Sequence, residues 1–356
     1  MSGGSLLNIP RTHFLRSIFL SNFKRLSFPF KCSLAITYRC NMHCKMCNIW
    51  RKPERKELDV EEIDRFFKNA PDFSWVGITG GEPFLRDDIV DIIEAIVRRS
   101  RRLCTVHIAT NGFLADRIRS TIGKVRKRHK DLELVFTVSI DGPPDIHDFI
   151  RGVNGVWQRA MDTFFYLKQT PGCKVQFGFT MSRRNAGRFK EAFYAIKHVY
   201  PALRFDDVNV NIFQKSDFSY DNQDVEAPDR DRLLEEIKEI LSMDKDRFSI
   251  NNFLRRTYLR LYPLCCRLKK TPVKCQAFSS SLFIDPYGNM FPCVVYNKKI
   301  INIKEMSGDF ALFWNSGPAK ELSRECSQNI CPVCWSPCDA FSSISGSLWE
   351  ALTKHA

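Results

Sequence analysis

The sequence has no acidic side chain before Glu54, although lysines and arginines occur at positions 11, 16, 24, 25, 31, 39, 45, 51 and 52. It has no apolar run near the ~18 residues that a membrane-spanning helix needs. No secretory signal is visible, because Lys24 and Arg25 follow the short apolar stretch at 18–20 at once. No internal repeat has a fixed period. With 44% hydrophobic and 26% charged residues in 356, the chain is typical of a globular protein, which excludes a disordered or fibrous one.

Cysteine and positive charge are in excess: the chain has 14 cysteines and a net charge of +14. Without a signal we expect a reducing, cytoplasmic compartment, where clustered cysteines bind metal or do redox work. The positive charge favours nucleic acid, anionic membranes or acidic substrates as partners. The basic runs at 98–102 and 124–130 fall on predicted outer helices, so we interpret them as solvated faces and do not expect a nucleic-acid partner.

Five segments are expected along the chain. Residues 1–31 form a basic N-terminal extension, whose apolar residues between 14 and 26 have helical spacing. Two interpretations of this helix stay open: it touches anionic lipid as an interfacial helix, or it packs on the main domain. Residues 32–225 form the core, 226–264 linker helices, 265–342 a cysteine-rich module and 343–356 a tail. The polar stretch 216–231 is interpreted as a linker.

The core has alternating strand and helix patterns. Strands are predicted at 34–37, 75–79, 104–109, 134–140, 174–180 and 207–213, with helical patterns between them. Such alternation predicts an α/β fold with a parallel sheet, here a partial (β/α)6 barrel similar to three-quarters of a TIM barrel. Barrels of this kind carry their chemistry at the C-terminal ends of the strands.

A first cysteine group follows the first predicted strand. Cys40, Cys44 and Cys47 have the spacing C-x3-C-x2-C in one short loop. Three thiolates can bind three irons of a four-iron cluster and leave the fourth iron open for another ligand. A zinc site with His43 as fourth ligand is the alternative, but His43 lies between two of the cysteines and is poorly placed to close a tetrahedron with them.

This loop resembles the signature of the radical S-adenosylmethionine (radical SAM) enzymes. Further segments agree, each at the end of a predicted strand: Gly80-Gly-Glu-Pro83, Thr110-Asn-Gly112, Ser139-Ile-Asp-Gly142 and Thr180. The resemblance implies that SAM contacts Met46, Gly80, Gly81, Glu82, Pro83, Thr110, Asn111, Ser139, Asp141 and Thr180. Within that set Glu82 would hold the methionine ammonium, and Met46 stands where the family usually has an aromatic residue. The resemblance also implies a [4Fe–4S] cluster, an external electron donor of the flavodoxin or ferredoxin type, and hydrogen abstraction by a 5′-deoxyadenosyl radical.

The second module holds more than half of the cysteines. Cys275, Gly288 and Cys293 have the spacing C-x12-G-x4-C, which resembles the SPASM/twitch extension of radical SAM enzymes. The later run of cysteines at 326, 331, 334 and 338 departs from the SPASM spacing C-x2-C-x5-C-x3-C. One auxiliary [4Fe–4S] cluster is therefore expected, with a second left open. Its ligands would be Cys275 and Cys293 with two of Cys331, Cys334 and Cys338, while Cys265, Cys266 and Cys326 are reserves. A structural zinc site is the alternative.

The substrate is less clear from the sequence. His147, Asp148 and Arg151 follow a predicted strand end, where they would bind an anionic substrate, act as acid and base, or only tie down a loop. We expect oxidation or rearrangement of a small molecule, sugar or lipid-type substrate, with peripheral contact to anionic membranes. The alternative is a maturase that cross-links or oxidises a ribosomally made peptide, although residues 1–31 are too short for the peptide-binding domain such enzymes often carry. A non-enzymatic iron–sulfur redox sensor would leave Gly80–Pro83 without a role.

Overall fold

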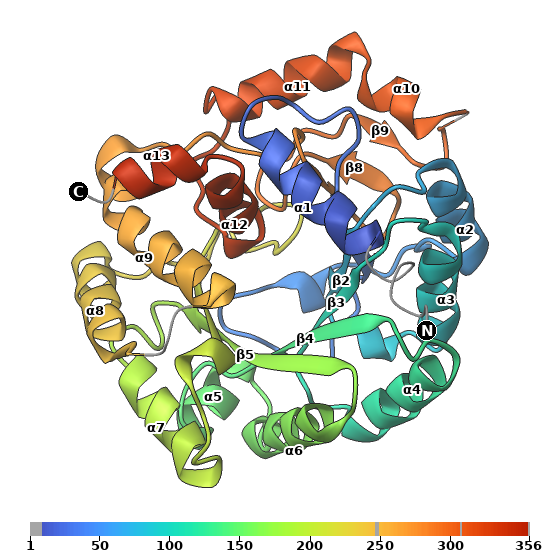
Figure 1. Cartoon of the computed structure of the whole chain (residues 1–356). Helices are drawn as coiled ribbons and strands as arrows, with labels where there is room; N and C mark the ends of the chain where they lie inside the picture. Colours follow the sequence, from blue (N-terminus) through green and yellow to red (C-terminus); the bar gives the residue numbers. More distant parts are fainter. Residues whose placement is uncertain (1–8, 246–248, 307, 355–356) are drawn as a thin grey trace, which may run out of the picture.

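A computed structural model describes residues 9–245, 249–306 and 308–354 of the chain (Figure 1). Its centre is one curved sheet in the order β6-β5-β4-β3-β2-β1-β7-β8-β9. The first six strands are parallel, as the alternating pattern predicts: β1 (Lys31–Thr37), β2 (Trp75–Gly80), β3 (Thr105–Thr110), β4 (Glu133–Ser139), β5 (Cys173–Met181) and β6 (Val208–Ile212). The predicted α/β class with a partial barrel is confirmed.

The C-terminal module continues the same sheet. β7 (Ser281–Ile284) pairs in parallel with β1, and Lys31 stands opposite Ser281 in the register. β8 (Asn289–Phe291) and β9 (Ile301–Asn302) follow in antiparallel. The turn between β7 and β8 needs Gly288, whose φ is +89° and where a Cβ would stand 2.9 Å from the Asn302 side-chain oxygen. The domain boundaries drawn from the sequence stay predictions.

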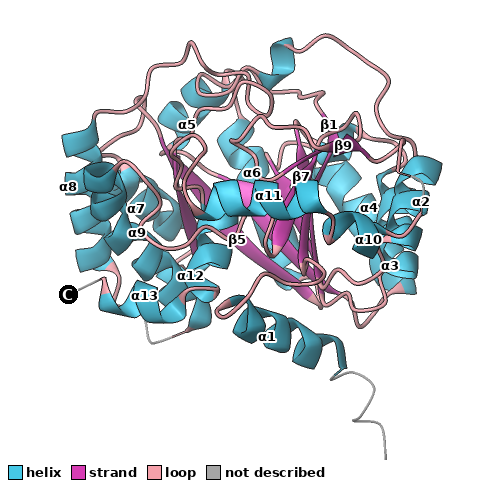
Figure 2. Ribbon diagram, turned by 90° about the horizontal axis from the view of Figure 1, so that it is seen from above, coloured by secondary structure: helices cyan, strands magenta, loops and turns pink. Residues whose placement is uncertain are grey.

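Helices cover the outer face of the barrel sheet (Figure 1). They are α2 (Val60–Asn69), α3 (Ile89–Arg99), α4 (Ala115–Arg128), α6 (Val156–Gln169) and α7 (Phe189–Val199), whereas α5 (Pro144–Arg151) lies at the end of the barrel where the strands end (Figure 2). Because successive strand residues point to opposite faces, apolar residues such as Ile78, Ile108 and Phe136 face these helices and are fully buried. Many of the alternate positions are polar and half-buried, such as His107 and Thr137, although Trp75, Ala109 and Val135 are apolar. The inner face of the barrel is therefore largely polar.

The remaining helices follow β6 in the chain and lie beside β6 or over the C-terminal module (Figure 1). They are α8 (Arg230–Met243), α9 (Ile250–Leu268), α10 (Phe310–Trp314), α11 (Gly317–Ser327), α12 (Pro337–Ser345) and α13 (Leu348–Thr353). Tyr258 of α9 ties this region together, because its hydroxyl accepts from Ile212 N at 3.1 Å and donates to Trp335 O at 3.0 Å. Among the described helices, none is long and apolar enough to cross a membrane.

The N-terminal helix α1 (Ile9–Ser21) lies across the end of the barrel where the strands begin (Figure 2). Phe14 stacks on Trp75 at 6.3 Å between ring centroids and contacts Phe30 edge-on at 5.4 Å. His13 Nδ1 lies 3.4 Å from Ser74 Oγ, just before β2. Of the two interpretations offered by the sequence, packing on the main domain is confirmed for this face of the helix.

Candidate active site

The first cysteine group lies in the loop that leaves β1 at the other end of the barrel, where the strands end. Cys44 is buried, and Cys40 and Cys47 are half-buried. Burial raises the pKa of Cys40 and of Cys47 to about 12, and the charges of neighbouring cysteines in the group add to the rise. Such thiols give up their protons when a metal supplies the compensating charge. The donor set therefore suits a tightly bound metal cluster.

Backbone hydrogen bonds fix this loop from the side of α5. His43 N donates to Arg151 O at 2.9 Å, and Lys45 N donates to Ile150 O at 2.8 Å. Gly152 ends α5 with φ +69°, and a Cβ there would stand 2.6 Å from His43 O. The glycine lets the end of α5 approach the cysteine loop closely.

The segment after β6 holds the loop from the opposite side. Asn48 N donates to Tyr220 O at 2.9 Å, and Asn222 Nδ2 donates to Met46 O at 3.1 Å. The stretch 216–231, interpreted from its polar composition as a linker, is thus in part a wall of the cysteine loop. Tyr220 and Asn222 are site residues that the sequence analysis missed, because a polar segment carries no signal of what it packs against.

The glycines at the end of β2 support the base of the same loop. Gly81 N donates to Thr37 O at 2.8 Å, and Glu82 N donates to Arg39 O at 2.9 Å. A Cβ at Gly81 would stand 2.7 Å from the Arg39 carbonyl carbon, and Gly80 has φ +136°. The resemblance implies that SAM contacts these glycines; the structure shows that they also approach the backbone from which Cys40 emerges.

Glu82 is fully buried and accepts three hydrogen bonds. Its donors are Thr110 Oγ1 at 2.9 Å, Asn111 N at 2.8 Å and Phe84 N at 3.2 Å. Burial raises its pKa to about 7, although these donors oppose the rise. A carboxyl group in this state is stabilised as the anion by an incoming cation, such as an ammonium group. Asn111 links Glu82 to the cysteine loop, because its Nδ2 also donates to Asn41 Oδ1 at 2.8 Å.

A buried ion pair follows β4 at the same end of the barrel. Arg151 Nη2 lies 2.5 Å from Asp141 Oδ2, and Arg151 Nη1 lies 3.8 Å from Cys44 Sγ. Burial raises the pKa of the Cys44 thiol, and the charge of Arg151 opposes that rise. Asp141 Oδ1 also accepts from Thr180 N at 2.9 Å, while Ser139 is half-buried on the inner face of β4. Asp141 and Thr180 thus come together, as their positions at strand ends predict, and Arg151 joins them from the end of α5.

The other two candidate acid–base residues have local partners. His147 is buried, and its Nδ1 accepts from Asp141 N at 2.9 Å, so the neutral ring carries its proton on Nε2. Burial and the charge of Arg151 lower its pKa well below its usual range. Asp148 accepts from Gly155 N at 2.5 Å and Trp157 N at 2.9 Å, at the start of α6. Both residues therefore hold the backbone around α5, between the end of β4 and the start of α6.

The second cysteine group is built from distant parts of the module. Cys275, Cys293, Cys326 and Cys334 belong to one buried apolar cluster, and Cys331 interacts with Cys326. Cys326, held only in reserve from the sequence, is 1% exposed within this cluster. The other reserves lie apart on α9: Cys265 packs into the main core, and Cys266 beside it is half-buried. Cys338 is exposed at the start of α12.

Both cysteine groups fit iron–sulfur clusters by their donor sets. No three His, Cys, Asp or Glu side chains of the described residues converge as they would on a single metal ion. A four-iron cluster places each thiolate on a different iron, so its ligands stand farther apart than those of one ion. The first loop offers three thiols, and the module offers at least four.

One apolar cluster joins the two groups. Cys40 and Cys47 pack against the cluster that contains Cys275 and Cys293. In the same region Phe218 stacks on Phe291 with 4.1 Å between ring centroids. Burial raises the pKa of Tyr220. The charges of Cys338, in the module, and of Cys47, in the first loop, raise it further, and Cys338 has the larger effect of the two. The Tyr220 side chain therefore lies within electrostatic reach of both cysteine groups.

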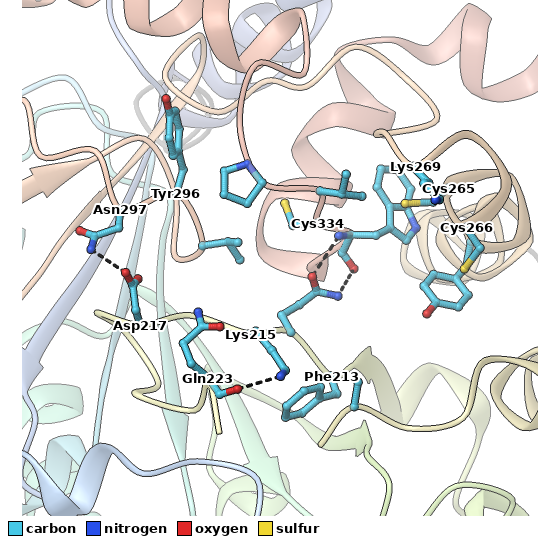
Figure 3. Close-up of a pocket in the computed structure, with 17 residues that line it drawn as sticks. Phe213, Lys215, Asp217, Gln223, Cys265, Cys266, Lys269, Tyr296, Asn297 and Cys334 are labelled. Atoms are coloured by element: carbon cyan, nitrogen blue, oxygen red, sulfur yellow. Dashed lines mark hydrogen bonds between the residues drawn. The ribbon is translucent and has the colours of Figure 1, made fainter. Parts of the chain in front are cut away.

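A cavity of about 730 Å³ opens beside the second group (Figure 3). It lies between the segment after β6, the end of α9 and the module, and Cys334 forms part of its wall. Lys215 Nζ donates to Gln223 O at 2.8 Å and Asn297 Nδ2 donates to Asp217 Oδ2 at 2.8 Å, and these pairs shape its rim. Sequence reasoning missed this cavity because its lining comes from segments far apart in the chain.

Comparison with known proteins gives two family matches. The model described as the radical SAM superfamily matches residues 34–181, and the iron–sulfur cluster-binding domain named SPASM matches residues 275–339. The chain is 22% identical over 338 residues to the antilisterial bacteriocin subtilosin biosynthesis protein AlbA of Bacillus subtilis, over 89% of this chain and 68% of that protein. It is 29% identical over 163 residues to the AdoMet-dependent heme synthase of Oleidesulfovibrio alaskensis, over 44% of this chain and only 40% of that protein.

Two solved structures share the fold. Streptococcus suis SuiB bound to the precursor peptide SuiA has a TM-score of 0.61 at 16% identity, over 97% of this chain and 76% of that chain. The protein anSMEcpe with bound AdoMet has a TM-score of 0.59 at 15% identity, over 91% of this chain and 98% of that chain. Each likeness covers more than nine-tenths of this chain.

Proposed function

Because the chain belongs to the radical SAM superfamily, in its SPASM-containing subgroup, we propose that this radical SAM enzyme modifies a peptide. The observation that carries the proposal is the extent of the likeness. The bacteriocin biosynthesis protein and the peptide-bound SuiB match most of this chain, whereas the heme synthase matches only 44% of it. The substrate class is a peptide rather than the small molecule first expected.

The residues at the strand ends would hold the cofactors. A [4Fe–4S] cluster with SAM, and auxiliary cluster chemistry in the module, follow from the two family matches. We assign the first cluster to Cys40, Cys44 and Cys47, and the auxiliary one to Cys275, Cys293, Cys334 and a fourth cysteine drawn from Cys326, Cys331 and Cys338. When bound, the first cluster supplies the electron that splits SAM and yields a 5′-deoxyadenosyl radical, which abstracts a hydrogen atom from the substrate.

Several side chains at the strand ends would bind SAM and orient it. Glu82 would take the ammonium group of SAM, because its buried carboxyl lacks a nearby cation other than Arg151. Asp141 and Thr180, joined at 2.9 Å, would meet the rest of the cofactor from β4 and β5, beside the half-buried Ser139. Arg151 would favour the thiolate of Cys44 by its charge. Tyr220 and the aromatic residues between the two groups would exclude water from the space the radical crosses.

The cavity beside Cys334 would receive the peptide. Its 730 Å³ exceeds the volume of a single side chain, and its rim carries both a lysine and an aspartate. A substrate there would touch the auxiliary group, which can accept the electron left after hydrogen abstraction and so complete a two-electron oxidation or cross-link. The oxidoreductase outcome and the external flavodoxin or ferredoxin donor belong to this proposal.

The test is substrate-stimulated cleavage of SAM. Anaerobic holoenzyme with dithionite would be given peptides encoded by short reading frames beside its gene, and, separately, anionic sugars and nucleotides. We expect a peptide to raise 5′-deoxyadenosine formation and to lose hydrogen by mass spectrometry, with Cys44→Ala inactive and Cys104→Ala active. Stimulation by a small molecule and by no peptide would overturn the proposal.

Oxidation of a small polar molecule remains a second candidate because of the inner face of the barrel. His107 Nε2 lies 2.9 Å from Thr137 Oγ1, and Gln176 Nε2 donates to the same oxygen at 3.2 Å. These half-buried groups would offer hydrogen bonds to a sugar or nucleotide. The same assay separates the two candidates.

A further inference from the structure

The end of the molecule opposite the cysteine loop exposes a group of apolar side chains. Phe19 is 63% exposed, Phe23 72% and Trp349 79%. Together with other exposed residues of the same two segments they form what we call the aromatic patch: Leu15, Phe19, Phe23, Leu348, Trp349 and Leu352. The patch belongs to α1, the turn that follows it and α13, and the two helices lie on the same side of the molecule in both views (Figures 1 and 2). Exposed groupings of this kind mark sites of interaction.

Hydrogen bonds hold the two helices of the aromatic patch in fixed positions. Asn22 joins the two helices, because its Nδ2 donates to Ser345 O at 2.9 Å and its Oδ1 accepts from Leu348 N at 2.8 Å. Gln276 of the module reinforces this link by donating to Ser21 O at 3.1 Å and to Gly346 O at 3.0 Å. The rings of Phe19 and Phe23 lie 5.1 Å apart. Three segments far apart in sequence thus hold the aromatic side chains in place.

Positive charge lies on the same face of the molecule as the patch. α3 ends at Arg99 and α4 at Arg128, and each helix leads into a loop at the end where the strands begin, so both basic runs reach the face that α1 covers. α1 touches both neighbouring loops, through Arg102 and through Glu133. Exposed basic residues with no carboxylate partner among the described residues are Arg16, Lys24, Arg101, Lys127 and Lys130. The sequence predicts solvated faces for these runs; in the fold they lie on the same face of the molecule as the exposed aromatic residues.

We propose that this face docks on an anionic membrane surface and lies in the interface without crossing it. Aromatic and leucine side chains would enter the boundary between headgroups and acyl chains, and the surrounding lysines and arginines would meet the lipid phosphates and carboxylates. A second copy of the chain is a poor occupant, because a symmetric contact would bring two basic faces together. A nucleic acid would match the charge but leave the leucines without a partner. The catalytic end would face away from the membrane, so this proposal stands whether or not the substrate is a peptide.

The test is co-sedimentation of anaerobic holoenzyme with vesicles of phosphatidylcholine, alone or mixed with phosphatidylserine. We expect binding only to the mixed vesicles, weakened by salt because exposed charges are screened. Phe19→Ser with Trp349→Ser should weaken binding by about a hundredfold, at about tenfold for each lost apolar side chain. Arg101→Gln with Lys130→Gln should weaken it by about thirtyfold, at about 1 kcal/mol for each basic residue near the surface.

The matched control is Leu312→Ser, which removes another exposed leucine from α10, outside the aromatic patch. It should bind the vesicles like the unaltered protein, and all variants should cleave SAM at the unaltered rate, which shows that they fold. Absence of binding to the mixed vesicles, or equal binding by the Phe19→Ser, Trp349→Ser variant, would overturn the proposal. Self-association that the same variant abolishes in light scattering, without vesicle binding, would assign the face to a second copy instead.

Discussion

Replacing Gly81 with alanine should damage both stability and SAM cleavage, because Gly81 packs on the base of the cysteine loop. The added Cβ would stand 2.7 Å from the Arg39 carbonyl carbon and 2.9 Å from Tyr38 O. Both are backbone atoms, which cannot rotate away as a side chain would. The end of β2 must therefore move away from the loop that follows β1.

The magnitude follows from what that movement breaks. The hydrogen bonds from Gly81 N to Thr37 O at 2.8 Å and from Glu82 N to Arg39 O at 2.9 Å span the contact. Losing one of them costs about 1 kcal/mol and forcing a methyl group into a packed site costs about 2 kcal/mol, so we expect about 3 kcal/mol of lost stability. Cys40 follows Arg39 directly, and a displacement of about 1 Å at a reacting centre lowers a rate by about a hundredfold.

The assay pairs this variant with Gly123→Ala. Gly123 is exposed on α4 and has no atom within contact distance of an added Cβ, so that change should stabilise the helix by about 0.5–1 kcal/mol and leave catalysis alone. Chemical denaturation of the anaerobic protein measures stability, and 5′-deoxyadenosine formation with dithionite measures cleavage. If Gly81→Ala matched Gly123→Ala in both measurements, the close contact between β2 and the cysteine loop would not matter, and our account of the two glycines would be refuted.

Three further predictions concern the cysteines and the barrel interior. Cys44→Ala should abolish SAM cleavage and lower the iron count from about eight to about four per chain, with Cys104→Ala as the unaffected control; retained cleavage contradicts the cluster assignment. Cys326→Ala should lower the iron count by as much as Cys334→Ala if Cys326 is an auxiliary ligand. An unchanged iron count in Cys326→Ala would show that Cys326 only packs in the module. Burial and the charge of Lys31 lower the pKa of His107 to about 4, so the unfolded chain binds a proton that the folded chain does not as pH falls below about 6.5. The free energy of unfolding should therefore drop by about 2 kcal/mol more between pH 7 and pH 5 than in His107→Gln; parallel pH curves for the two proteins would show that His107 is not the cause.

The sequence predicts most of the barrel because its signals are local. Each of the six predicted core strands overlaps a strand of the structure, and Gly288 of the C-x12-G-x4-C pattern stands in the turn between β7 and β8. Alternation of polar and apolar residues and the turn chemistry of Gly288 act within a few residues, so a linear pattern contains them. The order of cysteines and glycines at strand ends likewise places Cys40, Gly81 and Asp141 at one edge of the sheet.

What the sequence does not predict depends on distant contacts. Cys326 joins the second group although the linear spacing favours other cysteines, because the fold of the module decides which thiols converge. Tyr220 and Asn222 hold the cysteine loop from a segment whose composition resembles a linker. His147 and Asp148 are bound to nearby backbone amides, which a list of polar residues after a strand cannot reveal.

The pairing of β1 with β7 has a consequence for biogenesis. On the ribosome β1 is made early, and β2 soon covers one of its edges, but residues 281–284 emerge only after most of the chain. Until then the other edge of β1 carries unpaired backbone groups beside the first cysteine loop, which is an aggregation hazard. If iron and sulfide reached that loop before the chain was complete, β1 would still lack its pairing with β7. We expect release of the full chain to precede stable cluster insertion, so truncation before residue 281 should leave a protein that aggregates and retains little iron in anaerobic lysates.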